Sequence, residues 1–81
     1  MHNALPPLPP NAPKVGEVYT HYKGNLYKVV GLALHSTEEW VVVYQAMYDN
    51  PAAELFTRPL AEWREVVEWQ GAHVERFIRQ S

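Results

Sequence analysis

The stretch "HYKGNLYKVVGLALHS", residues 21–36, predicts a tight turn followed by a long β-strand. Gly24 and Asn25 both tolerate the positive φ that such a turn requires. The ten residues after the turn, 26–35, are mostly apolar on both alternating faces, and this is typical of a central strand. Gly31 in the middle predicts a bulge or a bend, which a small curled sheet needs.

Strict alternation divides the side chains of this strand between two predicted faces. One face carries Leu26, Lys28, Val30, Leu32 and Leu34. The other face carries Tyr27, Val29, Gly31, Ala33 and His35. Three further runs rich in β-branched and aromatic residues predict strands at 15–22, 40–48 and 54–58.

The segment "PLAEWREVVEWQG", residues 59–71, fits two structures. Its apolar residues have helical spacing, and Pro59 suits the first turn of a helix. The run "EVVEW" within it is equally good strand sequence. We therefore expect one helical turn at 60–64 followed by a fifth strand at 65–70. The alternative is a single amphipathic helix over 60–70, packed on a four-stranded sheet.

Together these elements predict a mainly β protein, a small SH3-like barrel or roll of about five antiparallel strands with one short helical turn near residues 60–64. We expect residues 1–14 to be a proline-rich flexible leader outside the core, and residues 15–79 to form a single SH3-like domain. The segment "LPPLPPNAP", residues 5–13, holds five of the seven prolines and favours extended polyproline II. Its PxxP spacings leave open a docked alternative, on an aromatic surface of the same or a neighbouring chain.

Composition limits the classes of function. The chain has 81 residues and a net charge of −2, with seven basic and nine acidic residues, so a nucleic-acid partner held mainly by phosphate contacts is not expected. It has no cysteine, so disulfides and thiolate chemistry are excluded. We expect no membrane association, because there is no signal peptide pattern and no run near the roughly 20 apolar residues that span a bilayer. The expected location is the cytoplasm.

Four blocks of residues, in order along the chain, resemble a family of small bacterial domains designated domain of unknown function 1653. The blocks are Gly16, Tyr19, His21 to Asn25, Tyr27 and Val29; Ala33, His35-Ser36, an acidic pair, Val42 to Ala46 and Tyr48; Arg58-Pro59-Leu60 with Glu62 and Trp63; and Arg76-Phe77. The resemblance covers about residues 15–79. It implies an SH3-like barrel roll and no established activity, and barrels of this type commonly serve as binding modules.

The candidate ligand-binding residues are the polar side chains within these blocks: His21, Lys23, His35, Tyr44 and Arg58. Arg58 stands before a proline that favours an extended backbone, where its guanidinium suits a carboxylate or phosphate. The structural alternative for Arg58 is an ion pair with Glu38, Glu54 or Glu62. For Arg76-Phe77 we expect phenylalanine to anchor the end of the chain while arginine stacks or pairs at the surface. Likewise, the five tyrosines either pack in the core or form an aromatic groove.

The leading hypothesis is a noncatalytic binding module for an anionic small ligand, a peptide or an acidic protein surface. The alternative is an interaction or homo-oligomer module that uses the proline-rich leader and the strand edges. A small enzyme using histidine acid/base chemistry is the third hypothesis, and it needs His21 or His35 beside Glu38 or Arg58 in one cleft. No cofactor and no metal are expected, because the histidines and the neighbouring glutamates lack a ligand spacing signature.

Overall fold

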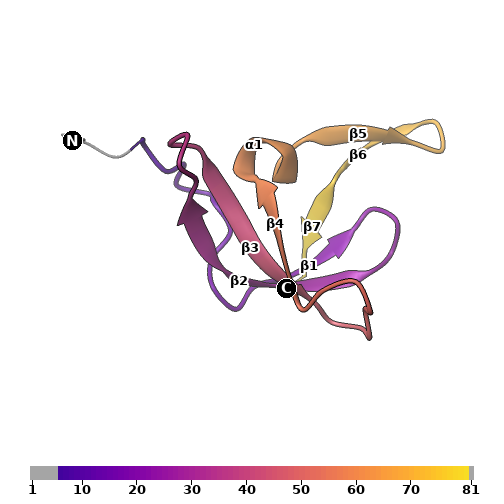
Figure 1. Cartoon of the computed structure of the whole chain (residues 1–81). Coiled ribbons are helices and arrows are strands. Elements are labelled where there is room, and N and C mark those ends of the chain that lie inside the picture. The colour runs from indigo at the N-terminus through magenta and orange to yellow at the C-terminus, as the bar shows by residue number, and fades with distance from the viewer. Residues whose placement is uncertain (1–5, 81) are drawn as a thin grey trace.

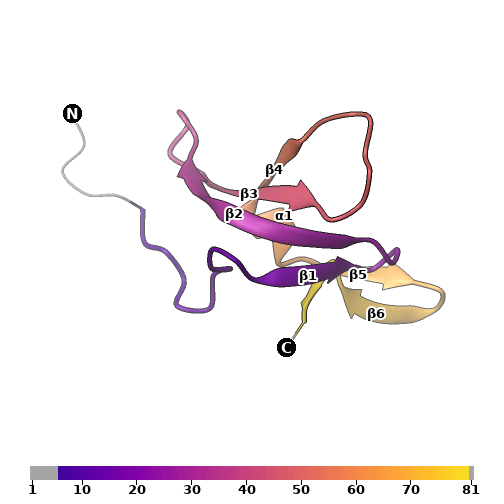
Figure 2. The same ribbon diagram turned by 90° about the horizontal axis from the view of Figure 1, so that it is seen from below.

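The computed structural model describes residues 6–80, which are mainly β with one short helix (Figure 1). The elements are β1 (Val18–His21), β2 (Leu26–Leu34), β3 (Trp40–Ala46), β4 (Leu55–Pro59), α1 (Leu60–Trp63), β5 (Val66–Trp69), β6 (Ala72–Glu75) and β7 (Phe77–Arg79). Five strands form one antiparallel sheet in the order β4-β3-β2-β1-β7. The remaining two, β5 and β6, form a separate ribbon that projects from the sheet in both views (Figure 2).

The hairpin between β1 and β2 and the bulge in β2 confirm the local predictions. Gly24 has a φ of 112°, and its N–H donates to the carbonyl of His21 at 2.7 Å. The pairing of β2 with β3 shifts between Val29 and Gly31, where the glycine was expected to interrupt the strand. Because one extra residue sits in β2 at this point, the strand bends and the sheet curls.

The bulge also corrects the predicted faces of β2. Strict alternation placed Leu32 opposite Tyr27 and Val29, but Leu32 packs against the same core as these two residues. The extra residue at the bulge reverses the alternation beyond it, since each one-residue shift moves a side chain to the other face. Val30, on the outer side, remains 41% exposed.

The C-terminal third follows the predicted helical turn but not the predicted closing strand. Helix α1 begins directly after Pro59, whose φ is −53°, and the alternative helix over 60–70 is wrong. Residues 66–69 are a strand, yet they pair with β6 through a turn in which Gln70 and Gly71 have φ values of 52° and 82°. The fifth strand of the sheet is instead β7, which pairs with β1.

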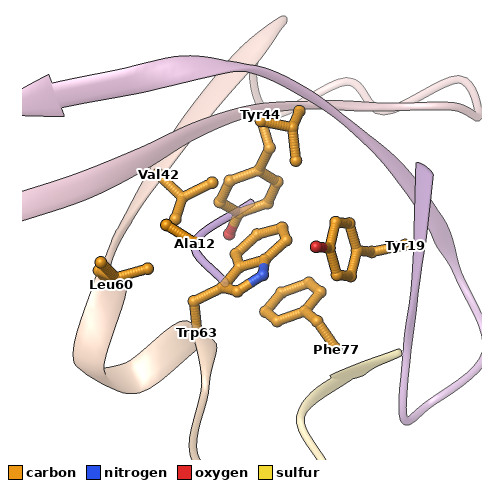
Figure 3. Packing of buried hydrophobic residues seen from close by; sticks show 8 residues of the cluster. Ala12, Tyr19, Val42, Tyr44, Leu60, Trp63 and Phe77 are labelled. Carbon is orange, nitrogen blue, oxygen red and sulfur yellow. The ribbon is translucent and has the colours of Figure 1, made fainter. Parts of the chain in front are cut away.

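The core lies on the concave side of the curled sheet and is largely aromatic (Figure 3). The rings of Trp63 and Phe77 stack at 3.7 Å with 5° between their planes, and both residues are almost fully buried. Tyr44 on β3 contacts both rings edge-on, at 5.0 Å and 5.8 Å. Side chains therefore join α1, β3 and β7, although the described strands β4 and β7 do not pair and the sheet is not a closed barrel.

The proline-rich segment contacts the sheet through its described residues, 6–13. The indole Nε1 of Trp40 donates to the carbonyl of Pro6 at 3.1 Å, and Ala12 belongs to the core cluster. The expectation that the first fourteen residues lie outside the core is therefore wrong at Ala12. The N–H of Ala12 donates to the carbonyl of Pro9 at 3.1 Å and closes a tight turn, and the small side chain of Ala12 packs in the core cluster.

Candidate functional site

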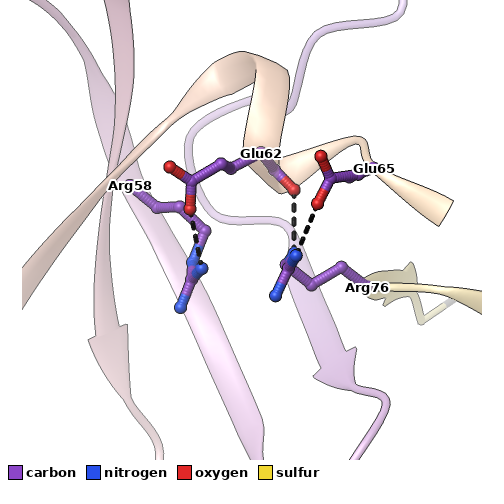
Figure 4. Close-up of polar contacts among 4 residues, drawn as sticks. All are labelled: Arg58, Glu62, Glu65 and Arg76. Carbon is purple, nitrogen blue, oxygen red and sulfur yellow. Dashed lines mark hydrogen bonds and ion pairs between the residues drawn. The ribbon is translucent and has the colours of Figure 1, made fainter. Parts of the chain in front are cut away.

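Two arginines from different elements meet at Glu62, on the exposed side of α1 (Figure 4). Nη1 of Arg58 lies 3.2 Å from Oε1 of Glu62. Arg76, the residue before β7, donates from Nε to the carbonyl oxygen of Glu62 at 3.1 Å and from Nη2 to Oε1 of Glu65 at 2.6 Å. The ion pair predicted between Arg58 and Glu62 is confirmed, and so is the surface pairing predicted for Arg76.

Arg58 reaches across the open side of the curled sheet. It pairs with Val42, a fully buried residue, so its side chain points to the concave face. Its guanidinium carbon lies 5.6 Å from the centre of the Phe77 ring, an arrangement in which the ring face attracts the cation. Nε of Arg58 is buried and has no acceptor among residues 6–80. One donor of this guanidinium is thus desolvated and uncompensated.

His21 lies beside the same ring, at the end of β1. It pairs with Phe77, and the two ring centres are 5.0 Å apart in an edge-to-face arrangement. The Tyr22 ring lies 4.4 Å away, and the backbone N–H of Lys23 donates to Nδ1 of His21 at 3.2 Å. These contacts fix the imidazole at the margin of the aromatic core.

Three cationic side chains act on His21, although the whole chain carries a net charge of −2. Its pKa lies below the ordinary value of 6.5, first because burial disfavours the charged imidazolium and then because Arg58, Arg76 and Lys23 repel a further positive charge. We call His21, Arg58 and Arg76 the basic cluster. Arg58 and Arg76 of this cluster are each paired with a carboxylate, Glu62 and Glu65 respectively.

The other predicted site residues take different positions. Tyr44 is only 6% exposed and forms part of the floor beneath Phe77, so its ring supports the cluster from inside. Lys23 is exposed in the turn, with Nζ 5.8 Å from the Tyr22 ring. His35 lies beyond the far end of β2, and its Nδ1 shares a hydrogen bond of 3.1 Å with the hydroxyl of Thr37.

The structure brings His21 and Arg58 together and keeps His35 apart from them. Strand β2 spans nine residues, so its two ends lie up to about 26 Å apart. Arg76 is the member of the basic cluster that was not among the predicted ligand residues. The signal in the sequence was its place directly before the anchoring Phe77, which holds the arginine next to the core edge.

The tyrosines divide between the core and its margin near His21. Tyr19 and Tyr44 are core residues, and Tyr22 and Tyr27 are half-buried around His21. Tyr48 is 40% exposed, and its hydroxyl lies 3.0 Å from that of Tyr27. The half-buried rings therefore line the side of the basic cluster and do not form a separate groove.

Residues 6–80 contain neither a metal-ligand cluster nor a membrane-spanning helix. No three His, Asp or Glu side chains gather there in a way that could hold a metal ion. The short helix α1 is the one helix of this part of the chain, and it is neither long nor apolar enough to cross a bilayer.

Comparison with known proteins gives one consistent result. The model of the family described as "Protein of unknown function (DUF1653)" matches residues 17–79. A crystal structure of a DUF1653 protein from Bordetella bronchiseptica is similar to this chain at 40% sequence identity and a TM-score of 0.72, with 75% of this chain and 80% of that chain covered. No curated protein matches the chain.

Proposed function

The chain belongs to the DUF1653 family, whose description assigns no function, and we propose that it is a noncatalytic binding module for an anionic group. In this proposal Arg58 and Arg76 hold the anion, and His21 lies beside it. The observation that carries the proposal is the buried, unpartnered Nε of Arg58, near a His21 ring whose pKa is lowered in part by Arg58, Arg76 and Lys23. A carboxylate or phosphate on a ligand matches the planar donor pattern of guanidinium.

Glu62 and Glu65 act as the internal competitors of the anion. Their side chains are 50% and 54% exposed, while those of Arg58 and Arg76 are 27% and 19% exposed. Ion pairs with such exposed partners contribute little free energy, about 0–1 kcal/mol. A ligand anion therefore displaces the glutamate side chains into water at small cost, and the better-buried arginines remain in place to receive it.

We also propose that the curled sheet is an SH3-like roll. Five antiparallel strands with a short helical turn before the C-terminal strands support this assignment. The contact of Arg58 with Phe77 spans the opening between the two edge strands, β4 and β7. In such a roll the basic cluster lies where the edges approach, which makes it accessible to a ligand from outside.

The test is an NMR titration of the His21 ring with two probes, inorganic phosphate and a hexaglutamate peptide. We expect at least one probe to cause a saturable shift and to raise the pKa of His21, because an added negative charge stabilises imidazolium. Phosphate alone indicates a small-ligand site, and the peptide alone indicates an acidic polypeptide partner. If neither probe shifts His21 in a saturable way, the proposal is wrong.

Two variants separate binding from folding. Arg58→Gln should weaken binding about tenfold or more, since a charge-assisted hydrogen bond is lost. Glu62→Gln should tighten binding, because the internal competitor loses its charge, whereas a purely structural ion pair gives no such gain. Arg79→Gln is the matched control, because Arg79 pairs with Glu17, away from Glu62. Equal affinity in all four proteins contradicts the proposal.

The other hypotheses from the sequence stay predictions. The interaction or homo-oligomer hypothesis is tested by light scattering at two protein concentrations. A molecular mass that increases with concentration supports self-association, and a constant monomer mass contradicts it. Removal of residues 1–13 in the same experiment tests the role of the leader. The enzyme hypothesis and the cytoplasmic location also stay predictions.

A further inference from the structure

Trp63 has a buried hydrogen-bond donor with no partner. The residue is 2% exposed, and its indole Nε1 finds no acceptor among residues 6–80. Figure 3 shows this nitrogen facing the space between Tyr19 and Phe77. A buried N–H without an acceptor costs the free energy of its lost hydration, so such groups in folded proteins are normally paired.

Trp63 also lines a pocket of about 320 Å³, and neither Arg58 nor His21 is among the lining residues of this pocket. Its walls are the rings of Tyr19, Trp63 and Phe77, and Arg64 and Glu75 are among its polar lining residues. The volume is at the lower end of the range of about 300–1,000 Å³ that is usual for small-molecule sites. Flat aromatic walls with a few polar groups are also usual for such sites.

The hydroxyl of Tyr19 is already engaged and does not serve a ligand as a donor. It donates to Oε1 of Glu17 at 3.0 Å. Its pKa is raised to about 12, first by burial and then by Glu17, so the phenol keeps its proton at neutral pH. Arg79 lowers the pKa of Tyr19 and Glu75 raises it, so charges of both signs act on this ring, whereas the charges that act on His21 are cations.

We propose that this pocket binds a small, uncharged, planar molecule that carries both a carbonyl oxygen and an N–H group. The carbonyl accepts the N–H of Trp63, the N–H donates to the carboxylate of Glu75, and the flat body lies among the aromatic walls. Arg64 and Glu75 carry opposite charges at this pocket, so an uncharged molecule suits it better than an ion of either sign. A molecule without an acceptor leaves the Trp63 donor unpaired. The residues proposed to bind the molecule, Trp63 and Glu75, are not members of the basic cluster, although Phe77 lines this pocket and also contacts Arg58 and His21.

The experiment observes the three indole N–H resonances by NMR while uracil, a planar molecule with both groups, is added up to its solubility limit. Trp63→Phe identifies the Trp63 signal. We expect a saturable downfield shift of this signal alone, because hydrogen bonding deshields the proton, while the indoles of Trp40 and Trp69 serve as internal controls. If the Trp63 signal does not move, or all three signals drift together without saturation, water satisfies this donor and the proposal is wrong.

A second measurement tests the role of Glu75. Glu75→Gln should weaken uracil binding about tenfold, since a hydrogen bond to a charged acceptor is replaced by a neutral one. The compound 1,3-dimethyluracil keeps the carbonyls but lacks the N–H groups, so its affinity should not respond to this substitution. Glu68→Gln, on the exposed side of β5, is the control. A uracil affinity that is the same in all variants overturns the assignment of Glu75.

Discussion

The two ends of strand β2 carry similar sequence signals but have different surroundings. At its start, His21 packs on Phe77 and Tyr22, and its pKa is lowered by burial and by nearby cations. Beyond its end, His35 is exposed and bonds to Thr37 within its own turn. A histidine at the end of an apolar strand therefore does not by itself indicate a site.

The difference comes from what covers each end. At the start of β2, α1 and β7 bring Trp63 and Phe77 over the sheet from far along the chain. At the other end, Trp40 packs at the edge of the core and donates a hydrogen bond to the carbonyl of Pro6 in the proline-rich segment. Dense aromatic packing lowers the local polarity and strengthens charge effects, so functional groups gain their properties at the first end.

The largest expected effect is that of Trp63→Ala. This ring stacks on Phe77 and contacts Tyr19 and Tyr44, so its removal leaves a large cavity under the His21 end of the sheet. We expect a loss of about 3–5 kcal/mol in the free energy of unfolding, measured by urea denaturation. Trp69→Ala is the matched control, because Trp69 is 37% exposed and contacts the sheet through the Tyr22 ring. If both variants lose the same free energy of unfolding, the core around Trp63 is not what stabilises the His21 end of the sheet.

The second effect compares the histidines directly. We expect His21→Ala to lower the free energy of unfolding by roughly 1–2 kcal/mol at neutral pH, since ring contacts and one hydrogen bond are lost. We expect His35→Ala to change it by less than about 0.5 kcal/mol, as is usual for exposed positions. Urea denaturation measures both. If His35→Ala loses more free energy of unfolding than His21→Ala, the conclusion that only His21 is packed into the fold is wrong.

The elements predicted correctly from the sequence are those with local causes. The turn at Gly24, the bulge at Gly31 and the helical turn after Pro59 each depend on the backbone preferences of one or two residues. Strand β7 was not predicted, because it has three residues and only Phe77 among them is buried. Its place beside β1 depends on ring contacts with β3 and α1, which no local pattern encodes.

The spatial arrangement of the candidate residues follows from the sequence only in part. Arg58 and His21 lie together, since both point to the concave face, which alternation indicates. Arg76 was assigned a structural role only, because its partners Glu65 and Glu62 are eleven and fourteen residues away. Whether a surface ion pair also receives a ligand depends on burial and on the summed charge, which are properties of the folded chain.

The third prediction concerns the His35 end of β2, where Trp40 contacts the proline-rich segment. Trp40→Phe removes the hydrogen bond to Pro6 and keeps an aromatic ring, so we expect a loss of about 1 kcal/mol in the free energy of unfolding. The same substitution in a chain lacking residues 1–10 should cost less, because the acceptor is already absent. If the two losses are equal, the proline-rich segment does not stabilise this end through Trp40.

The smallest expected effect is electrostatic. Because the pKa of His21 in the folded protein is below 6.5, the unfolded chain binds more protons in the interval between the two values. The free energy of unfolding should therefore increase as pH rises through this interval, and it should lose this contribution as pH falls. Arg58→Gln removes one of the repelling cations, so it should raise the pKa of His21 and reduce the pH dependence.

The effect is small because His21 is only partly buried and water screens its charge. An NMR titration of the His21 ring gives its pKa, and urea denaturation at several pH values gives the linked stability. Arg79→Gln controls for a general change in charge, since Arg79 is not among the groups that lower this pKa. If Arg58→Gln and Arg79→Gln shift the His21 titration equally, the field at this end of β2 arises from overall charge and not from the basic cluster.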